Sequence, residues 1–244
     1  MSERGASLLS IEGLTKRFAG LTAVDDIGIE VAEHEFLGIV GPNGAGKTTL
    51  FSLIAGEQRP TEGRIVFDGT DITGWPADRV AKAGLVRTFQ LMRPFESMNV
   101  LENVMIATHQ HTPAPHAARH KALDVIERVQ LGRYATAMPA SLPTAALKRL
   151  ELARALALDP QVILLDEVLA GLVPAERAPM IELLRTLHGE GLTVMFIEHI
   201  MAAVLALSER LLVMHEGAQL ALGDPREVTE DPVVVEAYLG EDYA

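Results

Sequence analysis

The chain has 244 residues, 48% of them hydrophobic, so it can bury one substantial domain or a core with an inserted subdomain. It contains no cysteine, which excludes disulfide bonds, thiolate zinc sites and cysteine nucleophiles. Its net charge of −12 at pH 7 argues against a nucleic-acid partner, because a phosphate backbone would be repelled.

Strand-like segments dominate the N-terminal part of the chain. They are Leu8–Glu12, Ile27–Val31 and Arg64–Phe67, and polar turns such as residues 59–63 separate them. This pattern predicts an antiparallel β layer. Within it, Phe18 and Val24 precede a glycine-rich loop and are candidates to pack on an adenine ring, with ordinary core packing as the alternative.

The glycine-rich loop fits G-x-x-x-x-G-K-[ST] and lies between the apolar run Phe36–Val40 and the helix-like segment Leu50–Ile54. Its glycines let backbone N–H groups point inward, and the following helix N-terminus favours a polyphosphate. We expect Lys47 to reach the β- and γ-phosphates and the Thr48 hydroxyl to ligate Mg²⁺. The predicted nucleotide contacts of the loop are Gly41, Asn43, Gly44, Ala45, Gly46, Lys47, Thr48 and Thr49.

The strands stop between residues 92 and 155, where the hydrophobic spacing is helical and is broken only at residues 111–115. We therefore divide the chain into residues 1–91, with the β layer and the first part of the core, a helical insert, 92–155, and the rest of the core, 156–244. Four histidines of the insert allow a metal site as an alternative, although no carboxylate or thiolate cluster accompanies them and a solvated loop is favoured. They are His109, His111, His116 and His120.

The C-terminal half alternates apolar runs with helical patterns, which predicts a mainly parallel sheet covered by helices. A short hairpin is expected near its end, where two apolar runs flank residues 215–217. The predicted elements are strand Val162–Leu165, helix Ala175–Leu187, strand Leu192–Ile197, helix Ile200–Leu207, and the hairpin strands Leu211–Met214 and Gln219–Leu222.

Polar residues follow the predicted strands where an α/β sheet binds its ligands. Asp166 and Glu167 come directly after Val162–Leu165, and we expect Asp166 to hold Mg²⁺ and Glu167 to polarise the water that attacks the γ-phosphate. Gln90 follows the strand-like Leu85–Phe89, and His199 follows the strand that ends near Ile197. Both can face a γ-phosphate. The predicted catalytic residues are Glu167, His199 and Gln90, and the predicted Mg²⁺ ligands are Thr48, Gln90 and Asp166.

These motifs, in this order and spacing, resemble the ATP-binding subunits of ABC transporters, and the resemblance spans nearly the whole chain. Residues 86–90, 95–103, 197–199 and 237–241 are similar to the branched-chain (hydrophobic) amino acid importer group. The resemblance implies an α/β fold with a RecA-like P-loop NTPase core, an antiparallel β layer and an inserted helical subdomain. It also implies an Mg²⁺-dependent ATPase with two nucleotide sites shared across a dimer.

The same resemblance implies partners. They are membrane-spanning permease subunits, a second ATP-binding subunit, identical or not, and indirectly a periplasmic or extracellular substrate-binding protein. The sequence has no N-terminal signal and no apolar stretch of 18 residues, so we expect that the chain does not span a membrane by itself. The resemblance implies a peripheral protein at the cytoplasmic face of the membrane, held there by the permease subunits. A short helix of a permease is expected to dock near Leu91, Met92 and Phe95, directly after Gln90.

Two other functions compete with amino acid import. The ending at residues 238–242 also resembles the ATPase of a lipopolysaccharide-type lipid exporter, whereas residues 87–90 favour the importer. A soluble nucleotide-dependent switch is the third possibility, but tandem ATPase domains would favour it and this chain has only one.

The chain departs from the family at its signature loop. Leu142–Ala146 stands where the family has Leu-Ser-Gly-Gly-Gln, before the predicted helix Lys148–Ala157. Pro143 offers neither hydroxyl nor N–H to the partner's γ-phosphate, although Thr144 and the N–H groups of Ala145 and Ala146 can substitute. We therefore expect one slow and one fast site in a dimer with a partner of ordinary signature.

The loop after Glu167 departs as well. Val168 follows the glutamate where the family usually has Pro-Thr, and Ile200 replaces the aspartate that commonly follows the switch histidine. The Ala-Gly-Leu at 170–172 is retained. These changes concern the coupling between subunits and not nucleotide binding.

Overall fold

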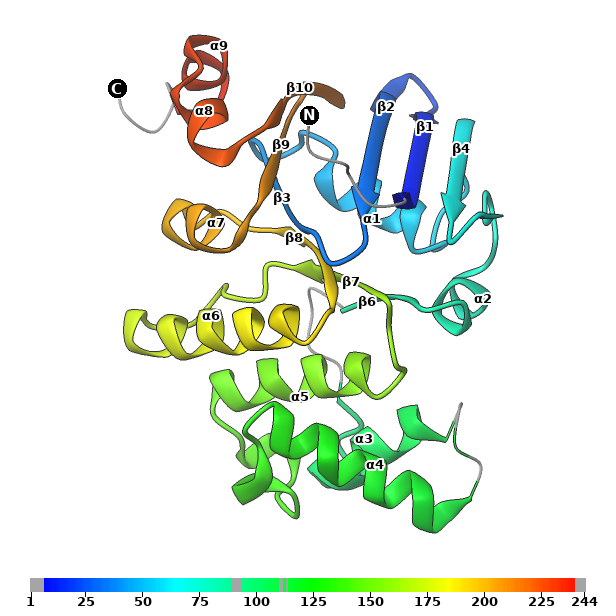
Figure 1. Ribbon diagram of the computed structural model, residues 1–244, viewed down its shortest axis with the longest axis vertical. Coiled ribbons are helices and arrows are strands. Elements are labelled where there is room, and N and C mark those ends of the chain that lie inside the picture. The colour runs from blue at the N-terminus through cyan, green and yellow to red at the C-terminus, as the bar shows by residue number, and fades with distance from the viewer. Residues whose placement is uncertain (1–6, 89–93, 110–111, 113, 240–244) are drawn as a thin grey trace.

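An antiparallel sheet lies over one side of the molecule in this computed structural model (Figure 1), which describes residues 7–88, 94–109, 112 and 114–239. Its four strands are in the order β2-β1-β4-β5. They are β1 (Ser7–Phe18), β2 (Leu21–Ala32), β4 (Glu62–Phe67) and β5 (Thr70–Asp71). The predicted antiparallel layer is thereby confirmed, with strands longer than their apolar runs suggest.

A second sheet of six strands runs through the centre in the order β10-β9-β3-β8-β7-β6. Its strands are β3 (Phe36–Val40), β6 (Leu85–Arg87), β7 (Val162–Asp166), β8 (Thr193–Ile197), β9 (Arg210–His215) and β10 (Ala218–Gly223). All neighbours pair in parallel except β9 and β10, which form the predicted hairpin with His215 opposite Ala218. The predicted mainly parallel sheet is confirmed.

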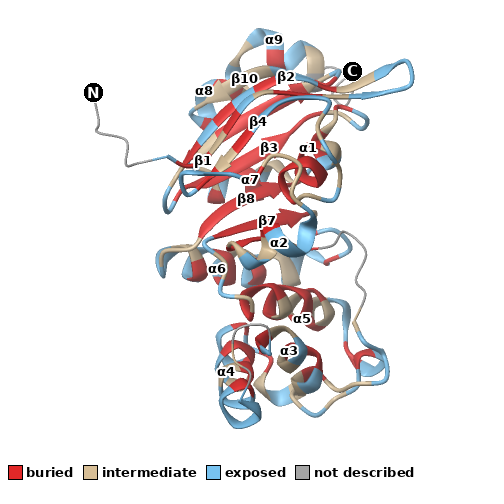
Figure 2. Cartoon of the chain, turned by 90° about the vertical axis from the view of Figure 1, so that its right-hand side faces the viewer, coloured by how far each residue is buried: buried red, intermediate tan, exposed pale blue. Residues whose placement is uncertain are grey.

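The central strands are buried along their whole length, because layers cover both faces of the parallel sheet. Side chains of β3 alternate between the two faces. Phe36 and Val40 join the core shared with the helices, whereas Leu37 and Ile39 join the core shared with the antiparallel sheet. Figure 2 shows these strands as a buried band between the layers.

Helices cover the two faces of this sheet. Helix α1 (Lys47–Ile54) lies between the two sheets, α6 (Pro174–Gly189) and α7 (Met201–Leu207) lie on the opposite face, and α2 (Ala77–Lys82) precedes β6 (Figure 1). The chain ends in α8 (Pro225–Glu230), α9 (Pro232–Val234) and a π-helical turn, Val235–Leu239. Among the described residues, no helix combines the length and the apolar character that crossing a membrane requires.

The described residues between β6 and β7 form a helical lobe at the foot of Figure 1. It contains α3 (Val100–Thr108), α4 (Pro115–Arg128), two short 3₁₀ turns, Gly132–Tyr134 and Pro139–Ser141, and α5 (Thr144–Leu156). Asn99 and Glu102 form a capping box at the start of α3, which fixes where this helix begins.

The buried Asn103 fastens the segment before α3 to that helix. Its side-chain amide donates to the carbonyls of Phe95, Met98 and Asn99, and its Oδ1 accepts from the Phe95 N–H, at distances of 2.8 to 3.1 Å. All polar atoms of this fully buried side chain are therefore satisfied.

Candidate nucleotide site

The loop between β3 and α1 is fixed by two close backbone approaches. Gly41 has φ +150°, and a Cβ there would lie 2.1 Å from the Met214 carbonyl oxygen. Gly46 has φ +96°, and a Cβ there would lie 2.2 Å from the Ala23 carbonyl oxygen. Only glycine fits these positions, because both the backbone conformation and the neighbouring backbone exclude a side chain.

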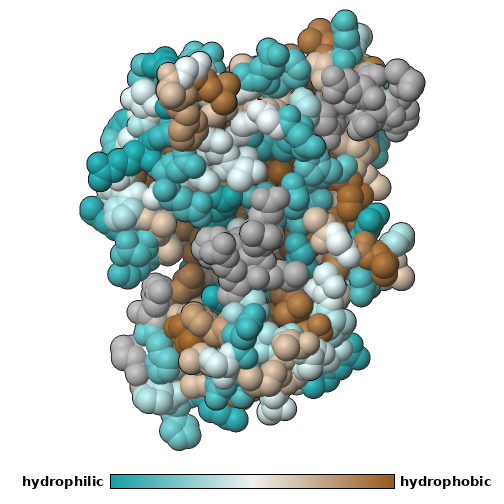
Figure 3. Space-filling model, turned by 180° about the vertical axis from the view of Figure 1, so that it is seen from behind, coloured by the Kyte–Doolittle hydropathy of each residue, from teal (hydrophilic) through white to brown (hydrophobic). Residues whose placement is uncertain are grey.

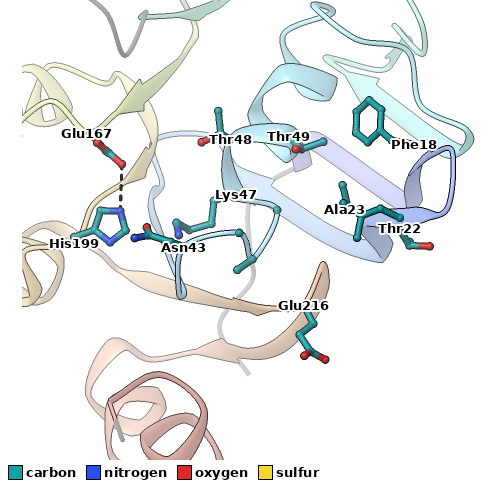
Figure 4. A pocket seen from close by; sticks show the side chains of 14 residues that line it. Phe18, Thr22, Ala23, Asn43, Lys47, Thr48, Thr49, Glu167, His199 and Glu216 are labelled. Atoms are coloured by element: carbon teal, nitrogen blue, oxygen red, sulfur yellow. Dashed lines mark hydrogen bonds and ion pairs between the residues drawn. The ribbon is translucent and has the colours of Figure 1, made fainter. Parts of the chain in front are cut away.

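Helix α1 begins at Lys47, directly after the loop, and no side chain caps its N-terminus. The first N–H groups of a helix have no acceptor within the helix, so those of Lys47, Thr48 and Thr49 are available to a phosphate. Thr48 and Thr49 line the cavity in front of the loop (Figure 4). The arrangement is an anion site built from main chain.

The Lys47 side chain folds back over its own loop and is buried. Its Nζ donates to the carbonyls of Gly41 at 2.6 Å and of Pro42 at 2.9 Å. Burial lowers the pKa of the ammonium group, while the charges of Glu167 and Asp166 act in the opposite direction. The ammonium is thus held where phosphate oxygens can replace the two carbonyl acceptors.

The loop opens into a cavity of about 650 Å³, within the range of small-molecule and cofactor sites. Figure 4 shows Glu167 and His199 at one end of the lining, Phe18 and Thr22 at the other, and Lys47 between them. The described lining residues are Phe18, Leu21, Thr22, Ala23, Asn43, Gly44, Ala45, Gly46, Lys47, Thr48, Thr49, Glu167, His199 and Glu216. Most of the residues predicted for nucleotide binding therefore share one cavity.

Asp166, the last residue of β7, is buried beside this cavity. Its Oδ2 accepts from Arg87 at 2.6 Å, and Arg87 also bonds Glu57 at 2.6 Å. The other oxygen of Asp166, Oδ1, is buried without a hydrogen-bond partner among the described residues. An orphaned carboxylate oxygen and the Thr48 hydroxyl are the hard donors that Mg²⁺ takes, so the residues present fit this ion. Gln90 lies outside the described residues.

Glu167 follows β7 and lines the cavity together with the loop. His199, which follows β8, places its Nε2 3.2 Å from Oε1 of Glu167, the contact dashed in Figure 4. Both side chains are partly exposed to solvent, at 25% for Glu167 and 39% for His199. A carboxylate in contact with an imidazole and open to the cavity is able to accept a proton from water.

Two buried charges lie behind Glu167. They are Lys148 of α5 and Glu198 at the end of β8, with exposed fractions of 8% and 2%. Burial lowers the pKa of Lys148 and raises the pKa of Glu198, while each group's charge opposes the shift of the other. The sequence pattern singled out neither residue, since both stand in otherwise ordinary positions of a helix and a strand end.

The far end of the cavity presents an aromatic ring. Phe18 lies at its wall with 42% of its surface exposed, and the Lys16 Nζ sits 4.9 Å from its ring centroid. An exposed aromatic ring beside a cation suits a stacked purine. Val24 has no exposed surface and belongs to the core under the antiparallel sheet, so the adenine contact predicted for it is replaced by core packing.

The sequence reasoning missed part of this wall. Leu21, Thr22 and Ala23 line it because the turn after Phe18 folds β2 back against β1, and Glu216 lines it from the turn between β9 and β10. The sequence predicts the hairpin turn at 215–217. Glu216 reaches the cavity wall only because this turn approaches β2 and packs against it. That approach is fixed by a bond from the Asp25 N–H to the Gly217 carbonyl at 2.9 Å.

The altered signature loop leads directly into α5, which begins at Thr144, four residues earlier than predicted. Pro143 occupies the N-cap position, and no side chain caps the helix. The Ala146 N–H donates to the Pro143 carbonyl at 2.9 Å. It is therefore not free to donate to a partner's phosphate, although the sequence analysis expected it to do so. The N–H groups of Thr144 and Ala145 are the first two of the helix and have no acceptor within it, so they can donate to a phosphate.

The histidines of the insert do not assemble a metal site in the part of the chain that the structure describes. No group of three potential metal ligands gathers there. His120 instead contacts Asp124 one helical turn away at 3.0 Å on an exposed surface. His111 lies outside the described residues.

Comparison with known proteins agrees with this geometry. A model of the family described as ABC transporter matches residues 24–170. The chain belongs to the ABC transporter family. A second model, described as branched-chain amino acid ATP-binding cassette transporter, matches residues 218–244.

Relatives of the chain align over nearly its whole length. It is 38% identical to the high-affinity branched-chain amino acid transport ATP-binding protein BraF of Pseudomonas aeruginosa, covering 96% of this chain and 98% of that protein. The identity to LivG of Escherichia coli, of the same description, is also 38%, with the same coverage. The lipopolysaccharide export system ATP-binding protein LptB of Acidithiobacillus ferridurans is 33% identical over 98% of this chain and 99% of that protein.

Solved structures share the fold. The ADP conformation of an ATP-binding cassette of an ABC transporter superposes with a TM-score of 0.87 at 31% identity, covering 96% of this chain and 99% of that one. A dimeric bacterial ABC transporter cassette gives a TM-score of 0.79 at 26% identity, covering 89% of this chain and 99% of that one. The RecA-like P-loop core with an antiparallel layer is thereby confirmed.

Replacing Lys47 by alanine should weaken ATP binding about 10- to 100-fold, because the charge-assisted bonds of the ammonium to phosphate oxygens are lost. Titration calorimetry with the purified chain measures this affinity. Lys82→Ala serves as control, since that lysine is exposed and pairs with Asp78 at 3.5 Å. Equal affinities for the wild type and Lys47→Ala would contradict the assignment of the loop.

Proposed function

We propose that this chain is the ATP-binding and ATP-hydrolysing subunit of an importer for branched-chain or other hydrophobic amino acids or related small organic ions. The observation that carries the proposal is the match of residues 218–244 to the branched-chain amino acid cassette family. The same chain has a cavity with a phosphate-binding loop in its wall. Full-length similarity to BraF and LivG supports it.

Different residues around the cavity have different roles in the proposed hydrolysis. The N–H groups at the start of α1 and the Lys47 ammonium bind the β- and γ-phosphates. Thr48, Asp166 and Gln90 are the residues that would hold Mg²⁺, and the ion when bound neutralises charge that develops on the phosphates. Glu167 accepts the proton of the attacking water as general base, and His199 orients its carboxylate. Phe18 stacks on the adenine.

The proposed partners follow from this role. Permease subunits would hold the chain at the cytoplasmic face of the membrane, a second ATP-binding subunit would complete each nucleotide site, and a substrate-binding protein would deliver the amino acid. The related cassette of known structure that is described as dimeric supports the second subunit.

A groove of about 260 Å³ between β6 and the helical lobe is the proposed docking site for the permease. Phe95 and Ile106 line it with 42% and 39% of their surfaces exposed, and Arg154 covers the Phe95 ring at 5.1 Å. Seen from behind, the lower part of the molecule carries apolar patches on its surface (Figure 3). Leu91 and Met92, predicted for the same surface, lie outside the described residues.

Lipid export is the second candidate function, favoured by the similarity to LptB over 98% of this chain. The ATPase chemistry proposed for the cavity is the same in both cases. Copurification separates the two, because an amino acid permease or a lipid exporter subunit would be isolated with the tagged chain from its native membrane.

Glu167→Gln should retain ATP binding while lowering hydrolysis by about 10²- to 10⁴-fold, since the amide cannot accept the proton of water. Single-turnover hydrolysis and calorimetry on the same preparation separate the two steps. Glu216→Gln removes a carboxylate from the same cavity and should leave the rate within a few-fold. Turnover of Glu167→Gln near the wild-type rate would mean that another residue positions the water.

Ile106→Asp should release the chain from its permease, because the docking groove then presents a charge to an apolar helix. The amount of permease isolated with the tagged chain from native membranes is the measurement. Leu205→Asp on α7, at 45% exposure, places the same charge on another surface and should keep the complex intact. Equal recovery of permease with both variants would place the docking site elsewhere.

The double change Pro143→Ser with Ala145→Gly should raise hydrolysis at the site capped by this loop, by up to about 10²-fold, because it restores a hydroxyl donor at the helix start. Pro143→Ala with Ala145→Gly lacks only that hydroxyl and serves as the matched control. Single-turnover rates in the assembled complex give the comparison. Two equal rates before mutation would show that the partner sites are already alike.

A further inference from the structure

The backbone of Glu167 adopts a conformation that needs external support. Its φ is +51°, in the left-handed region that residues other than glycine rarely occupy. The Glu167 N–H donates to the Ile197 carbonyl of β8 at 3.0 Å, and its carbonyl accepts from the Ala170 N–H at 3.1 Å. These main-chain bonds hold the start of the loop, and two buried side chains hold it further.

Lys148 provides the first of these side-chain contacts. It extends from α5 and donates from Nζ to the Glu167 carbonyl at 3.0 Å. With only 8% of its surface exposed, the ammonium is withdrawn from water and bonds directly to the main chain of the loop. A charge-assisted bond of this kind is stronger than one between neutral groups.

Glu198 provides the second contact, on the other side of Val168. Its Oε1 accepts from the Leu169 N–H at 2.7 Å, and its exposed fraction is 2%. Glu198 directly precedes His199, whose ring contacts the Glu167 carboxylate. The end of β8 therefore contacts the loop through the Ile197 carbonyl and through the side chains of Glu198 and His199.

We propose that Lys148 and Glu198 are positioning residues that fix the loop Glu167–Leu169 and thereby aim the Glu167 carboxylate into the nucleotide cavity. The proposal rests on the proposed role of Glu167 in ATP hydrolysis. Neither residue is among the described lining of the cavity, so their effect passes through the loop and not through contact with nucleotide.

Val168 lies between the two bonded residues of this loop, and its side chain is buried. Bonds at Glu167 and Leu169, on either side of it, constrain the loop from α5 and from the end of β8.

The first experiment separates catalysis from binding in the full-length chain within its assembled complex. Lys148→Met, which keeps the length but removes the charge, should lower kcat about 10- to 100-fold while the KM for ATP stays within about twofold. Lys148→Arg should recover kcat to within about threefold of the wild type. Lys82→Met is the control for loss of an exposed lysine.

The second experiment reads the loop without turnover. In the nucleotide-free full-length chain, amide hydrogen exchange at Leu169 should rise at least about tenfold in Glu198→Met, which has no oxygen to accept the Leu169 N–H, and exchange at Ala170 should rise likewise in Lys148→Met. Glu198→Met, which keeps the length of the side chain, should lower kcat in the same way, so the proposal does not depend on one variant folding.

The outcomes distinguish the two proposals. Wild-type kcat and unchanged exchange in Lys148→Met would overturn the positioning role. Equal losses in Lys148→Met and Lys148→Arg, with a lower urea midpoint in both, would also overturn it, because they indicate general destabilisation. Turnover retained by Glu167→Gln would instead refute the proposed general base, which the exchange measurements do not address.

Discussion

The nucleotide cavity depends on the clamping of the loop at 41–46 between the two sheets. The backbone of β2 at Ala23 and the end of β9 at Met214 press against this loop so closely that no Cβ fits at Gly46 or Gly41. A hydrogen bond from the Gly217 N–H to the Ala45 carbonyl, at 3.1 Å, joins the loop to the turn between β9 and β10. Because the antiparallel layer and the parallel sheet both touch the loop, their relative placement sets the direction in which its N–H groups point.

The phosphate-binding end of the cavity carries positive charge, although the chain as a whole is negatively charged. A protein of net charge −12 repels ATP at a distance, so binding depends on a local field. The buried Lys47 ammonium and the start of α1 supply that field, and Arg87 offsets part of the charge on Asp166. Glu167 remains near the cavity surface and in contact with His199, where a carboxylate is useful as a base.

Much of the fold was predictable from the sequence because buried parallel strands appear as short apolar runs. Val162–Asp166 and Thr193–Ile197 are of this kind, and polar residues at their ends marked Asp166, Glu167 and His199 as site candidates. The start of α5 was misplaced because Thr144 and the alanines after it carry no amphipathic pattern. Val24 was misassigned because an apolar residue near a loop is equally suited to a core, and only the packing of the sheet decides.

The long-range contacts were beyond the reach of sequence patterns. Glu216 reaches the cavity because two hairpins meet, and Lys148 reaches the Glu167 carbonyl because α5 packs beneath the end of β7. Neither residue belongs to a spacing that a motif describes. Each is placed by tertiary packing, which a local pattern does not encode.

The satisfied amide of Asn103 has a mechanical consequence for the helical lobe. Four hydrogen bonds join this one buried side chain to Phe95, Met98 and Asn99, and leaving its amide without partners would cost about 1 to 3 kcal/mol. We therefore expect the segment from Phe95 to Asn99 to move together with α3 as one rigid unit. A displacement of Phe95 would move α3 with it.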